Sequence, residues 1–264
     1  MHSSTYHLTR FAIQFKTIMK IRFSTLPFGN SALTCAFVGL TFFCLSNVSL
    51  AQDEHDFGSW FSVNTQGSLS PDLNSESRFR WWFDGHLRYL TDSGGFHQSI
   101  FRPGIGYKLN DQTSLWIGYG WINELPTNQQ PIFDENRVWQ QLIRTKTLGR
   151  FDYMSRTRFE QRFRNNSDNT GLRLRQFCKL SLPLDCENRW NWVVWDEMFF
   201  DLNETDWGQI GSFSQNRVFT GIGCNLNGLN KPRLEVGYLN QFIRRPGDDD
   251  PINHVLSANW FWTF

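Results

Sequence analysis

Long apolar segments are scarce in this sequence of 264 residues, whose mean hydropathy is −0.45. The longest largely apolar run covers about fourteen residues, 32–45, whereas a transmembrane helix needs about 20. A membrane protein built from several helices is therefore excluded. A surplus of one charge is also lacking, since 26 Lys and Arg oppose 25 Asp and Glu. Because nucleic-acid-binding domains usually carry a strongly basic stripe, we expect no nucleic-acid partner.

Acidic residues are absent from the first 51 positions, where four basic residues precede the apolar run. This order is typical of a secretory signal peptide, and the small residues Ser49 and Ala51 place the cleavage after Ala51. Met19 gives a signal of ordinary length and Met1 a longer one, and the sequence leaves both starts open. A single membrane anchor is the alternative, for which the run is short. We therefore expect export, with residues 1–51 removed.

Cysteine is also rare. Five are present, and Cys178, Cys186 and Cys224 remain beyond residue 51. Their spacing fits no metal site, and neither does the spacing of the histidines, so we expect no metal and no cofactor. In an oxidising compartment Cys178 and Cys186 could form a bridge across a short turn, and free thiols are the alternative.

A helical period is lacking from residue 57 onward, where apolar residues recur with a period of two. Aromatic side chains such as Phe79 and Phe83 alternate with charged ones such as Arg80 and Asp84. This alternation predicts amphipathic strands, and their length of roughly 9 to 14 residues suits a strand tilted across a bilayer. The strand candidates are residues 78–90, 101–109, 114–121, 137–145, 150–163, 172–180, 190–200, 216–226, 233–244 and 254–264.

Every second residue of a strand points to the same side, and we call each of these two sets a parity. The aromatic parity is expected to face lipid and the charged parity to face a polar lumen, as in outer-membrane barrels. Glycines on the charged parity, such as Gly104 and Gly118, leave room for bulky neighbours. A soluble β-sandwich, with its charged face in water, is the structural alternative. The predicted fold class is all-β: a transmembrane antiparallel up-and-down β-barrel of about 10 strands over residues 77–264.

Residues 52–76 do not fit this scheme. An even number of strands would bring both ends of the barrel to the periplasm. Residues 57–65 alternate as well, so they form either a periplasmic or lumen-filling segment or an extra strand. With the extra strand, and one more that the pattern misses, the barrel would have 12 strands.

The last strand candidate ends at Phe264, and a terminal Phe on an alternating strand resembles the assembly signal of bacterial outer-membrane barrels. We therefore expect the barrel-assembly machinery and outer-membrane lipid as partners, and the outer membrane of a Gram-negative bacterium as the location. The connections between strands agree, because long polar ones alternate with short ones. The long connections, expected outside the cell, are 122–135, 164–170, 201–215 and 245–253.

Seven stretches also carry a family resemblance. They are Arg102–Tyr107 (RPGIGY), Ser114–Gly120 (SLWIGYG), Ser155–Arg162 (SRTRFEQR), Leu172–Arg175 (LRLR), Trp195–Phe200 (WDEMFF), Gln215–Arg217 (QNR) and Leu234–Leu239 (LEVGYL). In this order they resemble a family of secreted Gram-negative proteins catalogued as domain of unknown function 2490. The resemblance implies an outer-membrane barrel and brings no established activity and no catalytic residue.

The polar parity of the clearer strands carries fourteen basic and five acidic residues. The basic residues are Arg78, Arg80, Arg88, Arg102, Lys108, Arg137, Arg150, Arg156, Arg158, Arg162, Arg173, Arg175, Lys179 and Arg233; the acidic ones are Asp84, Asp152, Glu160, Glu197 and Glu235. Arginine pairs well with carboxylates and phosphates. Unpaired arginines in a closed interior are costly, so we expect some of them to meet water or an anion.

Two functions are compatible with such a lumen. The first is a narrow pore or ligand-binding barrel that favours small anionic solutes. The second is a plugged, non-conducting barrel with a structural or partner-binding role in the envelope, in which the same arginines are ion-paired filling. A lipid hydrolase is a weaker third, because His97 and Ser99 form only a partial catalytic set. We expect no enzyme.

Overall fold

The computed structural model describes residues 55–70, 77–91, 94–125, 133–165, 167–227, 232–245 and 250–264. The expected signal peptide and its cleavage site lie outside these ranges. The described residues form β-strands, and none of them belongs to a helix long and apolar enough to cross a membrane.

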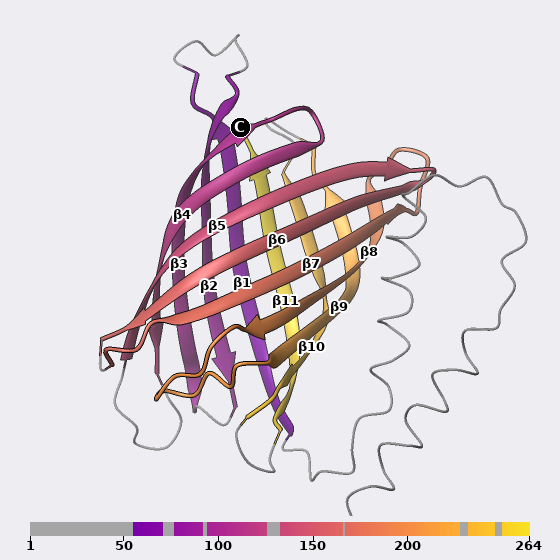
Figure 1. Ribbon diagram of the computed structural model, residues 1–264. Helices are drawn as coiled ribbons and strands as arrows, with labels where there is room; N and C mark the ends of the chain where they lie inside the picture. The colour runs from indigo at the N-terminus through magenta and orange to yellow at the C-terminus, as the bar shows by residue number, and fades with distance from the viewer. Residues whose placement is uncertain are drawn as a thin grey trace, which may run out of the picture. The chain divides into compact units, whose positions relative to one another are not determined.

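Eleven strands of 11 to 16 residues form one closed barrel in the described part of the chain (Figure 1). They are β1 (His55–Ser68), β2 (Phe79–Leu90), β3 (Gly95–Lys108), β4 (Thr113–Glu124), β5 (Phe133–Leu148), β6 (Phe151–Arg164), β7 (Gly171–Pro183), β8 (Trp190–Asp201), β9 (Phe213–Asn225), β10 (Arg233–Ile243) and β11 (Ile252–Thr263). Each strand from β2 to β11 pairs antiparallel with its neighbours in sequence. The predicted all-β barrel is thus confirmed, and its ten strands correspond to β2–β11.

The seam of the barrel differs from the prediction. β1 pairs antiparallel with β2 and parallel with β11, from His55 opposite Ile252 to Gln66 opposite Thr263. The expected even number of strands, with both ends of the barrel on one side, is therefore wrong. The parallel β1 strand satisfies the backbone groups that β2 and β11 would otherwise leave unpaired at an open edge. Alternation assigns faces to residues and says nothing about strand direction.

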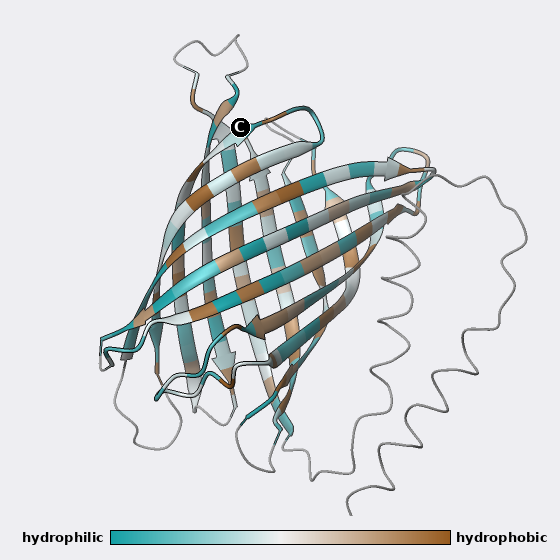
Figure 2. Ribbon diagram, in the orientation of Figure 1, coloured by the Kyte–Doolittle hydropathy of each residue, from teal (hydrophilic) through white to brown (hydrophobic). Residues whose placement is uncertain are grey.

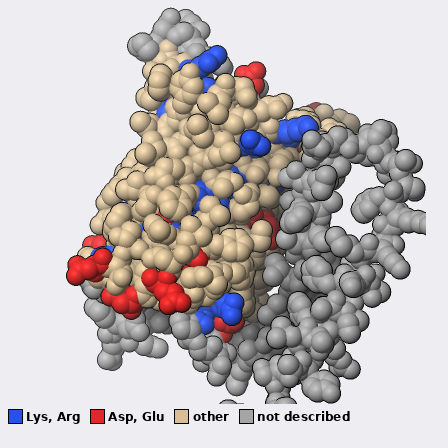
Figure 3. All heavy atoms as spheres, viewed as in Figure 1, with Lys and Arg blue, Asp and Glu red and all other residues tan. Residues whose placement is uncertain are grey.

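Hydropathy alternates along the strands in Figure 2, and the exposed fractions of the side chains show that the apolar residues point outward. Ile105 and Ile117 expose 59% and 49% of their surfaces, whereas Asp84 and Glu160, on the inward parity, expose 1% and 0%. In the view of Figure 3, most acidic side chains gather at the lower end of the barrel, below a largely uncharged middle. The predicted orientation, with apolar residues outward and charged residues inward, matches this arrangement.

The strand bounds place the connections 125–132, 165–170, 202–212 and 244–251 at one end of the barrel, which we call the long-loop end. The opposite end is the short-loop end, where Thr263 closes β11. The alternation of lengths is incomplete: 91–94 is short at the long-loop end, 69–78 is long at the short-loop end, and 184–189 and 226–232 at the short-loop end are at least as long as 165–170.

Glycines make room for tryptophans inside the barrel. A Cβ atom on Gly104 or Gly118 would collide with the indole of Trp139, and one on Gly106 would collide with Trp116. Trp139 is fully buried, and its indole N–H donates a hydrogen bond to the Tyr119 carbonyl oxygen at 3.1 Å. Trp116 and Trp139 thus fill the part of the interior that lies beside these glycines.

Candidate functional site

Two cavities lie in the barrel interior. The long-loop cavity has a volume of about 660 Å³ and the short-loop cavity about 350 Å³, both within the range of about 300–1,000 Å³ typical of small-molecule sites. Five residues border both cavities and form what we call the shared layer: Trp60, Arg88, Arg102, Arg175 and Arg217. Four of these five residues are arginines, so any solute that moved between the cavities would pass positive side chains.

The long-loop cavity is lined by an excess of cations. Only two carboxylate residues, Asp56 and Glu124, are among its lining residues in the described part of the chain. Eight arginines line it: Arg88, Arg102, Arg137, Arg162, Arg173, Arg175, Arg217 and Arg245. The net positive charge of the cavity wall depends on which of these arginines form ion pairs with carboxylates that do not themselves line the cavity.

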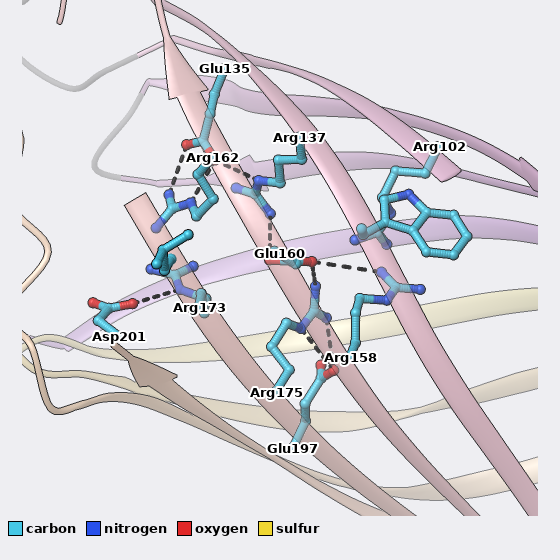
Figure 4. A network of polar contacts seen from close by, with 12 residues as sticks. Arg102, Glu135, Arg137, Arg158, Glu160, Arg162, Arg173, Arg175, Glu197 and Asp201 are labelled. Carbon is cyan, nitrogen blue, oxygen red and sulfur yellow. Dashed lines mark hydrogen bonds and ion pairs between the residues drawn. The ribbon is translucent and has the colours of Figure 1, made fainter. Parts of the chain in front are cut away.

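An ion-pair network on β5–β8 neutralises one group of arginines (Figure 4). Its central members are Arg137, Arg156, Arg158, Arg162, Arg175, Glu135, Glu160 and Glu197. Glu135 accepts from Arg162 Nε and Nη2 at 2.6 and 2.7 Å, and from Arg137 Nε at 2.5 Å. Glu160, fully buried, accepts from Arg175 Nη1 at 2.6 Å and lies 3.6 Å from Arg137.

The network continues toward the shared layer. Glu197 accepts from Arg156 at 2.8 Å and from Arg175 at 2.7 Å. On β2 and β3, Asp84 accepts two bonds from Arg102, at 2.8 and 2.7 Å. Paired, buried charges of this kind are structural, because removing one partner would leave the other uncompensated.

Glutamine holds three arginines, one of which, Arg158, also lies 3.8 Å from Glu160 in the network. Arg88 donates to Gln98 at 2.7 Å, Arg158 donates twice to Gln141 at 2.8 and 2.7 Å, and Arg217 donates to Gln215 at 2.6 and 2.9 Å with the carboxamide oxygen turned toward it. We call Arg88, Arg158 and Arg217 the glutamine-held arginines. A carboxamide accepts hydrogen bonds and carries no charge, so it fixes the guanidinium and leaves its positive charge uncancelled.

Trp60 orients two of these arginines. The guanidinium carbons of Arg88 and Arg217 lie 4.0 and 5.0 Å from the centre of its ring, and Arg217 also lies 4.7 Å from the ring of Phe199. Such cation–π contacts attract a guanidinium without neutralising it. The carboxylate nearest to Arg217 among the described residues is Glu197, at 4.0 Å. The shared layer therefore keeps surplus positive charge.

The structure places most of the predicted lumen residues inside the barrel. Arg88, Arg158, Arg162, Arg175, Asp84, Glu160, Glu197 and Glu235 are buried, and Arg80, Arg156 and Arg173 are half-buried. Arg173 pairs with Asp201 at 2.7 Å, and Glu235 pairs with Lys179 at 2.6 Å. Arg78, Arg150 and Asp152 are exposed near strand ends and stand apart from the network.

Sequence reasoning missed several members of the site. Glu135 lies one alternation step before the predicted start of its strand at Arg137, and Arg217 lies on a strand whose alternation is weak. Trp60 belongs to the segment that did not fit the predicted topology. The glutamines carry no charge, so a search for charged lumen residues passes over them. Glu135 would have been found if each predicted strand had been extended by two residues, which adds one more inward-facing position.

The other sequence candidates have simple surroundings. Cys178, Cys186 and Cys224 are free thiols, as the alternative to a bridge requires. His97 hydrogen-bonds the Leu125 carbonyl oxygen at 3.2 Å and lies 3.9 Å from Glu124. Among the described residues, no group of three or more His, Cys, Asp and Glu side chains is placed to hold a metal ion.

Comparison with known proteins identifies the family of this chain. An uncharacterized protein of Methylorubrum extorquens is 35% identical over 170 residues, which cover 62% of this chain and 72% of the relative. No solved structure matches the chain. The family model described as protein of unknown function (DUF2490) matches residues 57–251, which include β2–β10, all but the first two residues of β1, and the whole ion-pair network. The chain therefore belongs to the DUF2490 family.

Proposed function

We propose that this protein is an outer-membrane β-barrel of a Gram-negative bacterium, exported with a cleaved signal peptide, whose interior takes up small anionic solutes. Four features support the membrane placement: the basic and apolar sequence before the barrel, the closed barrel, the apolar outward parity and the alternation of apolar and polar residues along β11. Outer-membrane lipid is then the solvent of the outer surface, and the barrel-assembly machinery recognises β11.

One observation carries the anionic preference. Eight arginines and two carboxylate residues line the long-loop cavity, and two of these arginines, Arg88 and Arg217, are glutamine-held. Uncancelled positive charge in a restricted, poorly hydrated space attracts anions strongly. The guanidinium fork also matches the two oxygens of a carboxylate or phosphate. A negatively charged solute would find partners here that a neutral one would not.

A plugged, non-conducting barrel is the second candidate. It is favoured by Arg158 and Glu160, which have no exposed surface and belong to a network that spans four strands. In that case the barrel would serve the envelope through its loops or its outer surface. The two candidates differ in whether an anion can enter the shared layer.

The membrane placement is tested by fractionating cells that express the full-length chain. We expect the mature protein in the outer-membrane fraction, with detergent required for extraction. We also expect the unheated sample to migrate differently from the boiled one in electrophoresis, because a closed barrel resists unfolding by detergent. Recovery from the periplasm without detergent would contradict the placement and favour a soluble barrel.

A further inference from the structure

The short-loop cavity differs in chemistry from the long-loop cavity, because aromatic side chains make up much of its lining. Its aromatic and sulfur-containing residues are Trp60, Trp82, Met154, Phe177, Trp195, Phe261 and Trp262, contributed by β1, β2, β6, β7, β8 and β11. Trp195 stacks on Phe219 with ring centres 5.2 Å apart and contacts Phe177 at 5.4 Å. These contacts hold a rigid aromatic surface beside an open volume of about 350 Å³.

The same cavity also carries surplus positive charge. Two carboxylate residues, Asp84 and Glu197, line it in the described part of the chain, whereas six cationic residues do: Arg88, Arg102, Arg156, Arg175, Lys179 and Arg217. Lys179 pairs with Glu235, and Arg102 with Asp84. Arg88 and Arg217 remain glutamine-held and lie where the aromatic lining meets the shared layer.

We propose that the short-loop cavity is a binding site for an aromatic monocarboxylate. The ring would pack among Trp195, Phe177 and Phe261, where offset and edge-on aromatic contacts contribute beyond simple burial. The carboxylate would point to the shared layer and accept hydrogen bonds from Arg217 or Arg88. The other cations of the cavity lie within 2.8 Å of a carboxylate oxygen, closer than Arg217 lies to Glu197 at 4.0 Å, so the ligand carboxylate would act on Arg88 and Arg217.

This inference rests on the proposed uptake of anions and narrows it to one class. A small hydrophilic anion such as acetate would meet the arginines and leave the aromatic lining unused. A neutral aromatic amide would fill the lining and bring no negative charge to Arg88 and Arg217. The site therefore predicts that affinity requires the ring and the charge together.

Isothermal titration of the detergent-purified mature protein tests this with benzoate, acetate and benzamide as probes. We expect benzoate to bind at least about tenfold more tightly than either acetate or benzamide, a difference of about 1.4 kcal/mol. Phe261→Leu is expected to weaken benzoate binding and to leave acetate binding unchanged. Phe101→Leu is the matched control, since Phe101 is an aromatic residue of β3 that is 49% exposed on the outward parity.

The possible outcomes separate the two proposals. Equal affinity for benzoate and acetate would overturn the aromatic site and leave the anion preference standing. Benzamide binding as tightly as benzoate would overturn the role of the arginines in this site. No binding of benzoate or acetate would overturn both proposals. If Phe261→Leu fails to fold, competition between benzoate and benzamide on the wild-type protein still decides the question.

Discussion

Replacing Glu160 with leucine is expected to lower the free energy of unfolding by about 3–5 kcal/mol, the usual cost of removing one partner from a buried ion pair. Glu160 is fully buried, accepts from Arg175 at 2.6 Å and lies within 4 Å of Arg137 and Arg158. Its loss would remove one negative charge from beside these three buried cations and leave their charge less well compensated. Urea unfolding of the barrel in detergent micelles, followed by tryptophan fluorescence, measures the change.

A matched control separates this effect from a general loss of charge. Asp152 is an exposed acidic residue on the same strand, β6, so Asp152→Asn is expected to change stability by less than about 0.5 kcal/mol. Glu160→Gln keeps a hydrogen-bond acceptor and removes the charge, and we expect a smaller loss than for leucine. If Glu160→Leu were as stable as the wild type, the network would not be holding the barrel together.

Converting the glutamines that hold Arg88 and Arg217 to glutamate is expected to reduce the preference for anions. The double variant Gln98→Glu and Gln215→Glu keeps Arg88 and Arg217 in place and gives each a carboxylate partner in place of a carboxamide. A unit charge a few ångströms away in a partly buried site is worth a few kcal/mol, so we expect the affinity for benzoate to fall by about tenfold or more. Titration of the purified barrel measures it.

Gln112→Glu provides the control for this double variant. Gln112 is exposed in the connection before β4, at the short-loop end, so its replacement adds one negative charge away from both cavities, where the double variant adds two. We expect its benzoate affinity to match the wild type. An unchanged affinity in the Gln98→Glu and Gln215→Glu variant would show that the charge of Arg88 and Arg217 does not attract the ligand.

Much of the barrel could be predicted from alternation alone. The inward parity of β2 and β6 identified Asp84, Arg158 and Glu160 as interior residues, because a charged residue flanked by aromatic ones on a long strand has one energetically acceptable direction. The direction of β1 could not be read, since its residues alternate in the same way whether the strand closes the barrel in parallel or antiparallel fashion.

The charge balance of the site could not be predicted without knowing the register between neighbouring strands. Gln141 lies directly opposite Arg158, and Gln98 lies directly opposite Arg88, so which partner each arginine receives is set by strand pairing. A one-residue slip would present a different parity and a different partner. Counting fourteen basic against five acidic residues indicated a surplus, and only the paired strands show that a glutamine, and not a carboxylate, lies opposite Arg88 and Arg158.

The central claim is that an anion can enter the arginine-lined interior of a membrane barrel. The most direct test is the reversal potential of the refolded mature protein in a planar bilayer under a gradient of potassium chloride. We expect a discrete conductance whose reversal potential lies toward the equilibrium potential of chloride. A reversal potential on the potassium side would contradict the anion preference, and an inserted, heat-modifiable barrel that carries no current would contradict passage and favour the plugged alternative.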